Sequence, residues 1–285
     1  TTLSPSGILV TEGCRGDGGY LLDKNMSRFM VEKEPAKQEL ASRDVVSRHM
    51  QQTMRDGDGV DSPYGPHLWL DIRHLGEEHL RTKLLEVWDI CRDFAGLNPA
   101  EALIPVRPTQ HYSMGGIRVN KDGEAYGLAG LFAVGEAACW DMHGFNRLGG
   151  NSLAETLVSG RIVGRRVAEH AVGIALRADT EIAFDALHAA EKRAAGWLAR
   201  SGSGPSVYEI RDALGEIMMG KVGIFRSGDE LREAVAEIGQ LLDDCDNAVL
   251  RCKDPGVNPE LGFALRLQGM LRLAMTVAMG AEEVM

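Results

Sequence analysis

The sequence predicts a mixed fold, between the α+β and α/β classes, followed by an all-helical C-terminal region. Over residues 1–174, short apolar strands alternate with helical patterns. After about residue 175 only helical patterns remain, separated by short Gly, Pro or Asp breaks. Residues 130–171 join an apolar strand to a long helix through a glycine-rich turn, which is the local order of an α/β unit.

The individual elements follow from apolar periodicity and from turn residues. Strands are expected in HLWLDI, GIRVN and GLFAVGE, and two short ones over residues 6–23, around a glycine-rich turn. Helices are expected over 38–56, 77–95, about 152–171, 180–200, 205–219, 228–244 and 259–279.

Composition and charge narrow the possible partners. The chain has 285 residues, of which 44% are apolar and 25% charged, and this argues against disorder. The net charge is −10 and no basic stripe is present, so nucleic acid is not an expected partner. An acidic protein that binds an anion has to gather its cations locally. Isolated Arg and His residues in glycine-rich loops are therefore candidates for binding an anionic substrate.

The five cysteines indicate a reducing compartment. Their number is odd and no C-x-x-C pair occurs, which argues against a disulfide framework, a zinc ribbon or an iron–sulfur cluster within this chain. No uninterrupted apolar run is long enough to span a bilayer.

The stretch HGFNRLGGNSLAE has the pattern of an anion-binding turn. Arg147 precedes Gly149 and Gly150, and a predicted helix starts directly afterwards. The first amides of a helix have no intrahelical acceptor, and the two glycines allow a ligand to approach the backbone. The alternative is an ordinary β–α turn that carries a surface arginine.

Three other stretches place polar groups beside small residues. VTEGCRGDGG contains Thr11, Glu12 and Arg15, although a polar hairpin turn would look similar. ELASRDVVSRHM places Arg43 in the first turns of a helix, where a solvated helix face is the alternative. RPTQHYSMGGIRV has His111 in a loop before a strand, and a lone histidine is often structural.

Taken together, these motifs resemble one protein family over essentially the whole chain. The order TEGCRG, SRDVVSR, HYSMGGI, GLFAVGEAA and HGFNRLGGNSLAE is similar to the flavoprotein subunit of fumarate reductase and succinate dehydrogenase. The resemblance implies a capping domain over 1–110, the C-terminal part of an FAD-binding domain over 111–174, and a helical domain over 175–285. It also implies FAD as the cofactor.

The resemblance implies an FAD-dependent oxidoreductase that interconverts fumarate and succinate by transfer of a hydride at flavin N5 and of a proton. The substrate has two carboxylates. Arg147 matches the arginine that grips one of them, as a planar guanidinium suits two carboxylate oxygens. His111 and Thr11 match further substrate-binding residues.

Arg43 matches the residue that exchanges the proton, and Glu12 and Arg15 match the relay that supplies it. An arginine, with a pKa above about 12, is a poor acid in water. Partial desolvation and a second cation nearby, Arg147, would make its charged form less favourable. For the flavin, the resemblance implies contacts from Glu136, Ser152 and Leu153.

The resemblance also implies partner subunits. These are an iron–sulfur subunit and a membrane-anchor subunit of a quinone-linked complex that serves electron transport in anaerobic respiration. The chain would then lie in the cytoplasm, peripheral to the inner face of the cell membrane. CWDMHGFNRLGG, with Trp140 and Phe145, is similar to versions in three-subunit quinol:fumarate reductases.

The missing dinucleotide-binding loop and the residues shared with related flavoenzymes leave two other functions open. The family begins with a G-x-G-x-x-G loop, which is not found here, so the sequence is expected to be an internal fragment that also lacks the extreme C-terminus. A related soluble flavoenzyme, such as a single-chain fumarate reductase or an L-aspartate oxidase, would carry the same acid–base and carboxylate-binding residues. The other alternative is a non-catalytic fragment that binds no flavin.

Overall fold

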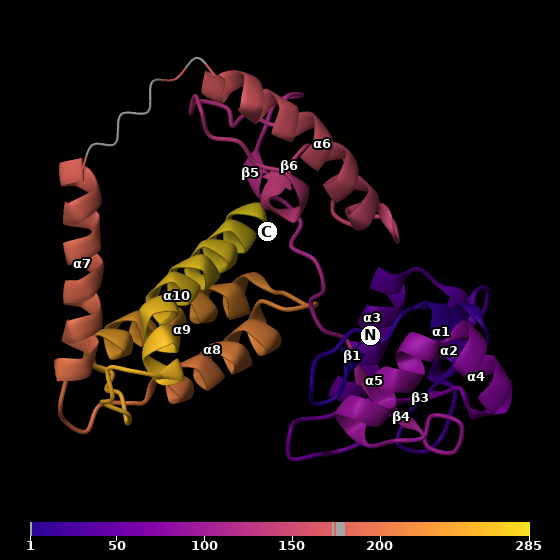
Figure 1. The fold of residues 1–285 in the computed structure, drawn as a ribbon. Helices are drawn as coiled ribbons and strands as arrows, with labels where there is room; N and C mark the ends of the chain where they lie inside the picture. Colours follow the sequence, from indigo (N-terminus) through magenta and orange to yellow (C-terminus); the bar gives the residue numbers. More distant parts are fainter. Residues whose placement is uncertain (1, 173, 175–179) are drawn as a thin grey trace. The chain divides into compact units, whose positions relative to one another are not determined.

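The computed structural model describes residues 2–172, 174 and 180–285, and the chain divides into two compact units, Thr1–Ala175 and Leu176–Met285 (Figure 1). The first unit mixes strands and helices. The described part of the second unit is helical apart from its connecting loops. The predicted fold class is therefore confirmed. The predicted boundary after residue 174 adjoins residues 175–179, which lie outside the described part.

A four-stranded antiparallel sheet organises residues 2–107, in the order β1-β4-β3-β2. Its strands are β1 (Thr2–Leu3), β2 (Tyr20–Leu22), β3 (Leu68–Asp71) and β4 (Ile104–Arg107). Alternate residues of β3 and β4 are buried, as expected for a sheet with one face against a core. That core also receives side chains from α3 (Arg43–Arg55), α4 (Glu77–Lys83) and α5 (Leu85–Ala95).

The prediction for residues 6–23 was wrong in its first half. Described residues 6–19 contain no strand, and the expected glycine-rich turn instead forms one helical turn, α1 (Gly13–Gly16), before β2. The amides of Arg15 and Gly16 both donate to the carbonyl of Glu12, at 3.1 Å. Leu9 retains only an isolated bridge to Thr2. The helical turn places the side chains of residues 12 and 15 on the same side, because they are three positions apart.

The predicted helix over 38–56 begins later than expected. A short turn, η1 (Gln38–Leu40), precedes it, and α3 starts at Arg43. Ala41 and Ser42 have ψ values of 157° and 150°, which a helix does not allow. The predicted helix over 77–95 is likewise two helices, α4 and α5, with the break at Leu84.

The remainder of the first unit contains β5 (Ile117–Arg118), η3 (Gly135–Ala137), β6 (Ala138–Cys139) and α6 (Asn151–Val172). The predicted strand in GLFAVGE was wrong. Gly130 and Gly135 have φ values of 80° and 61°, which an extended strand does not contain, and Phe132 makes only an isolated bridge to Glu124. The parallel strands that pair here are β5 and β6.

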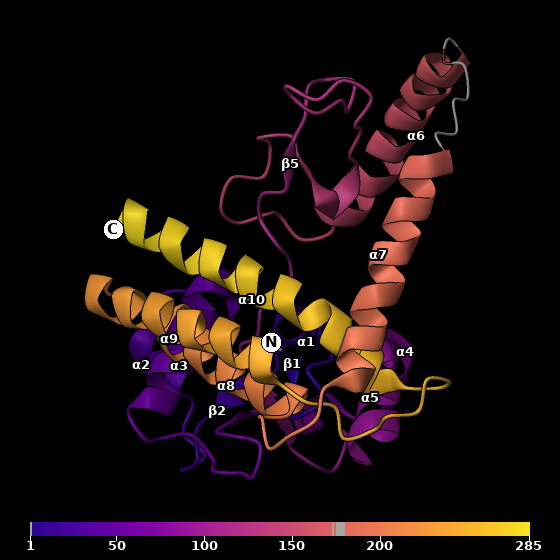
Figure 2. The ribbon, with the colours of Figure 1, turned by 90° about the vertical axis from the view of Figure 1, so that its left-hand side faces the viewer.

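The second unit is formed by α7 (Thr180–Ala199), α8 (Val207–Lys221), α9 (Gly228–Asn247) and α10 (Pro259–Val284). Helices α8, α9 and α10 pack side by side (Figure 2). Their starts follow from the local sequence: Ser206, Ser227 and Asn258 cap the three helices through their side-chain oxygens. None of the helices in the described ranges is both long and apolar enough to cross a membrane.

His67 makes the stability of the first unit depend on pH. The side chain is buried and neither ring nitrogen has a hydrogen-bond partner in the described structure. Desolvation, and then the nearby Arg107 cation, lowers the pKa of His67. In the unfolded chain the pKa is about 6.5, so protons bind the unfolded state preferentially as pH falls below that value. The stability contributed by the neutral ring is complete above it and is lost below it.

We therefore expect His67→Phe to remove this pH dependence. Urea unfolding midpoints should be measured from pH 8 to pH 5 for both proteins. The stability of the wild type relative to the variant should fall as the pH drops through 6.5. Parallel stability curves would contradict the prediction, whatever constant offset the new ring introduces.

Candidate functional site

An ion-pair chain links three of the predicted site residues. Arg15 Nη2 lies 3.8 Å from Glu12 Oε2, and Arg43 Nη2 lies 3.6 Å from Glu12 Oε1. Glu12 therefore contacts one arginine with each carboxylate oxygen. The helical turn α1 brings Arg15 to Glu12, and the late start of α3 makes Arg43 the first residue of that helix.

The two ends of this chain differ in their access to solvent. Arg15 is only 7% exposed, and its Nη1 donates to the carbonyls of Glu39 and Ala41. Burial lowers the pKa of Arg15, against the opposing effect of the Glu12 carboxylate. The side chains of Glu12 and Arg43 are 50% and 34% exposed. The chain of charges thus runs from the interior to an accessible end at Arg43.

The loop that carries Arg147 lies against this ion-pair chain. A Cβ atom on Gly149 would be 2.9 Å from Glu12 Oε1 and 3.4 Å from Arg43 Nη2. Nearby, Asn146 Nδ2 is 3.4 Å from Asp44 Oδ1. Three segments that are far apart in the sequence therefore meet here, and a side chain at position 149 would have to displace the Glu12 carboxylate.

Arg147 is buried, so it is not the surface arginine of an ordinary turn. It is 6% exposed, and its Nη1 donates to the Leu148 carbonyl at 2.8 Å. Its guanidinium carbon lies 4.4 Å from the centroid of the Tyr112 ring, within the range of a cation–π contact. Its Nε has no partner among the described residues. This nitrogen is therefore a buried donor without a partner in the described part of the chain.

Thr11 and His111 are less directly connected to the cluster. Thr11 is half-buried beside Glu12, and its Oγ1 accepts a hydrogen bond from the Gly13 amide at 3.2 Å. The His111 side chain is exposed. No hydrogen bond joins it to Arg43 or Arg147 in the described part of the chain, although the next residue, Tyr112, carries the ring beneath Arg147.

The predicted flavin-binding residues lie at η3 and at the start of α6. Glu136 is exposed, and its Oε1 accepts a hydrogen bond from the Ser113 amide at 2.7 Å. The amides of Ser152 and Leu153 have no acceptor among the described residues, and Leu153 is exposed. Free amides at a helix start, next to an exposed carboxylate, fit the polar groups of FAD.

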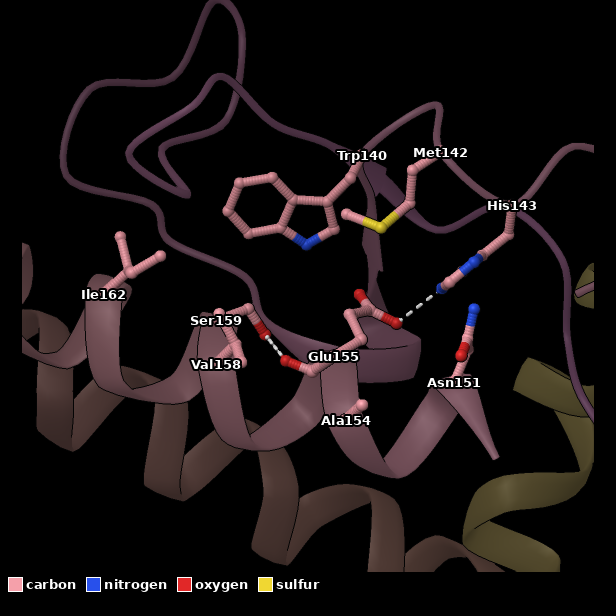
Figure 3. Close-up of a pocket in the computed structure, with 9 residues that line it drawn as sticks. All are labelled: Trp140, Met142, His143, Asn151, Ala154, Glu155, Val158, Ser159 and Ile162. Carbon is pink, nitrogen blue, oxygen red and sulfur yellow. Dashed lines mark hydrogen bonds and ion pairs between the residues drawn. The ribbon is translucent and has the colours of Figure 1, made fainter. Parts of the chain in front are cut away.

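A cavity of about 340 Å³ lies between α6 and the segment before Arg147 (Figure 3). Its lining residues are Trp140, Met142, His143, Asn151, Ala154, Glu155, Val158, Ser159 and Ile162. Trp140 Nε1 and Glu155 Oε1 are buried without partners in the described structure.

The sequence motifs did not single out Tyr112, His143 and Glu155, which form a contact network next to Arg147. Tyr112 and His143 lie inside the motifs HYSMGGI and HGFNRLGG, in which His111 and Arg147 are the residues that the family resemblance identifies. Glu155 had no clear sequence signal, because the burial that it shares with Ser159 and Val163 on one face of α6 is a feature of the folded helix. A carboxylate on a buried helix face normally has a partner.

Family models match both parts of the chain. One described as an FAD binding domain matches residues 1–153, and one described as the C-terminal part of fumarate reductase flavoprotein matches residues 211–283.

The curated relatives are also named as fumarate reductase flavoprotein subunits. The chain is 45% identical to a fumarate reductase flavoprotein subunit of Helicobacter pylori, with 99% of this chain and 43% of the relative covered. It is 34% identical to the corresponding Escherichia coli subunit, with 99% and 48% covered. The chain thus spans about half the length of the curated relatives it matches.

Solved structures of quinol–fumarate reductases also match nearly the whole chain. The chain is similar to a quinol–fumarate reductase structure with menaquinol molecules, with a TM-score of 0.87, 33% identity, and 99% of this chain and 50% of that chain covered. A structure of the Escherichia coli quinol fumarate reductase gives a TM-score of 0.85 at 33% identity and the same coverage.

Proposed function

Because the chain belongs to the FAD-binding-domain family, we propose that it is part of a flavin-dependent oxidoreductase that interconverts fumarate and succinate. The observation that carries this proposal is the ion-pair chain Arg15–Glu12–Arg43 beside the loop of the buried Arg147. The names of the relatives support the choice of substrate, since they are fumarate reductase flavoprotein subunits.

Substrate binding is proposed for Arg147, Thr11 and His111. A four-carbon dicarboxylate presents two anionic ends. Arg147 would hold one carboxylate, and its buried Nε without a partner supports this role, because a guanidinium binds two carboxylate oxygens through adjacent nitrogens. Thr11, next to Glu12, and His111, next to Tyr112, would contact the rest of the substrate.

Proton transfer is proposed for Arg43. Arg43 would give a proton to the fumarate carbon and would then receive a proton from Glu12. Arg15 would in turn reprotonate Glu12. The distances of 3.6 and 3.8 Å support this order, since each is within about 1 Å of a hydrogen bond. The lowered pKa of Arg15 also supports it, because a destabilised cation gives up its proton more readily.

Glu136, Ser152 and Leu153 would hold FAD, which supplies the hydride chemistry when bound.

We further propose that residues 1–110 form a capping domain over the substrate, 111–174 the second part of the FAD domain, and 175–285 a helical domain. The separation of two apolar clusters in the first unit supports the first boundary. One runs from Leu3 to Val106, and the other consists of Val119, Ala133 and Ala138.

The chain is proposed to work as the catalytic part of a quinone-linked complex at the cytoplasmic face of a membrane. Related structures are named as quinol–fumarate reductases, and one relative is named an 8-methylmenaquinol:fumarate reductase flavoprotein subunit. An iron–sulfur subunit and a membrane anchor would then carry electrons between quinol and the flavin.

A direct test uses the complete gene product that contains this sequence. It should be purified and examined for flavin absorbance. The oxidised flavin should then be offered succinate or L-aspartate, and the flavin reduced by an artificial electron donor should be offered fumarate. We expect bound flavin that fumarate reoxidises and succinate reduces. Turnover of L-aspartate instead would identify an oxidase, and absence of flavin would identify a non-catalytic protein. Either result would overturn the proposal.

Glu12→Gln tests the relay separately. The amide keeps the shape of the side chain but cannot pass a proton between two guanidinium groups. We expect turnover to fall by about 10²-fold or more, in line with general acid–base catalysis. Glu77→Gln, which interrupts the exposed pair of Glu77 with Arg81, is the matched control and should leave turnover unchanged. A Glu12→Gln enzyme with wild-type turnover would remove Glu12 from the relay.

A further inference from the structure

We propose that Glu155 is a positioning residue for the substrate-binding arginine: it anchors Tyr112 and His143, and the Tyr112 ring in turn fixes the Arg147 guanidinium. This inference rests on the proposed function, in which Arg147 binds a substrate carboxylate. It adds an acidic residue that touches neither substrate nor flavin in that proposal.

The first step is the burial of Glu155 in the second turn of α6. Its side chain is only 3% exposed. A buried carboxylate is costly unless it has charged or hydrogen-bonded partners, so its contacts indicate why the position is acidic. Oε2 lies 2.9 Å from His143 Nε2, and Figure 3 shows the two side chains pointing toward each other across the cavity.

The second step is the contact between Glu155 and Tyr112. The Tyr112 hydroxyl donates to the same Oε2 at 3.4 Å, a long hydrogen bond. Burial raises the pKa of Tyr112, and the Glu155 charge adds to this effect, so the phenol keeps its proton and remains a donor. The Tyr112 and His143 rings also meet edge to face, with centroids 6.4 Å apart. One carboxylate oxygen therefore holds both aromatic side chains.

The third step leads from the Tyr112 ring to Arg147. The guanidinium lies over the ring at 4.4 Å, and among the described residues its Nη1 donates to the Leu148 carbonyl at 2.8 Å. The face of the Tyr112 ring and the Leu148 carbonyl therefore fix the plane of the guanidinium. A bidentate carboxylate contact depends on that plane. Movement of the ring would therefore reduce substrate affinity before it affected proton transfer at Arg43.

The test compares variants of the complete FAD-loaded protein. Malonate, a dicarboxylate without a reducible double bond, reports affinity by calorimetry, and fumarate reduction reports KM and kcat. We expect Glu155→Gln to raise the malonate Kd and the fumarate KM about tenfold, as for the loss of one charge-assisted contact. The value of kcat should change much less. Glu169→Gln, at an exposed ion pair on the same helix, is the matched control.

Two Tyr112 variants decide whether the effect passes through this ring. Tyr112→Leu removes the surface beneath Arg147 and should match or exceed the loss in Glu155→Gln. Tyr112→Phe keeps the ring and should lose less. If Glu155 acts through the hydroxyl, Glu155→Gln combined with Tyr112→Phe should bind malonate no more weakly than Glu155→Gln alone. Additive losses would assign Glu155 a general structural role and overturn the inference.

The outcomes separate this inference from the proposed function. Wild-type protein that neither binds malonate nor reduces fumarate would overturn both. Wild-type binding that is unaffected by Glu155→Gln would overturn only the positioning role. If Glu155→Gln fails to fold, as judged by flavin content and melting temperature, Tyr112→Leu decides, because it leaves the Glu155–His143 pair intact. Unchanged malonate affinity in that variant would then overturn the inference.

Discussion

Replacing Arg43 by lysine is expected to reduce turnover by about 10²- to 10⁴-fold, the range of a lost proton-transfer group, while malonate binding weakens much less. Lysine keeps the positive charge at the first residue of α3. Its single nitrogen on a differently shaped side chain cannot both meet Glu12 Oε1, now 3.6 Å from Arg43 Nη2, and reach the substrate carbon. The measurements are kcat for fumarate reduction and the malonate Kd of the FAD-loaded protein.

The matched control for Arg43 is Arg48→Lys. Arg48 is on the same helix and forms an exposed pair with Asp44 at 2.9 Å. Exposed pairs of this kind contribute little, so turnover should be unaffected. If Arg43→Lys kept near-normal turnover but lost malonate binding, Arg43 would be a second carboxylate clamp rather than the acid.

Arg147→Lys is expected to impair binding and turnover together. The ammonium group loses the planar fork, the stacking on Tyr112 and the geometry for the Leu148 carbonyl. A hydrogen bond to a charged group contributes about 1.5–3 kcal/mol, so the malonate Kd should rise about 10- to 100-fold. The value of kcat should also fall, because the bound carboxylate is no longer held for reaction.

The control for Arg147 is another arginine–tyrosine pair in the same unit. Arg118 lies over the Tyr126 ring at 5.8 Å but is exposed and paired with Asp141. Arg118→Lys should leave both Kd and kcat unchanged. The pattern of KM and kcat then separates the two site arginines, since lost ground-state binding raises KM and a lost transition-state contact lowers kcat. Equal malonate affinity in Arg147→Lys and wild type would contradict the role of Arg147.

The helical second unit could be predicted from local sequence. Ser206, Ser227 and Asn258 cap their helices through contacts within three residues, so the starts of α8, α9 and α10 need no distant partner. The motif order likewise identified the candidate residues at positions 12, 15, 43 and 147, as well as the resemblance to a flavoprotein subunit. The residue types and turns singled out these candidates, and the resemblance implied their roles.

Other features depended on contacts between distant segments. GLFAVGE reads as a strand, but Gly130 and Gly135 adopt positive φ values that only the folded loop reveals. VTEGCRG reads as a strand and turn, yet its amides close onto Glu12 as a helical turn. In both stretches, glycine made several backbone conformations available, and the surrounding structure selected one.

The site itself was decided by tertiary structure. The residue pattern identified Arg147 but not its burial beside Tyr112, and it did not show what a side chain at position 149 would meet. The folded chain brings Glu12 and Arg43 close to that position, although both are more than 100 residues away in the chain. Glu155 became informative only when its buried carboxylate was found against His143 and Tyr112. The strength of an ionic contact depends on distance and desolvation, and packing between remote segments sets both.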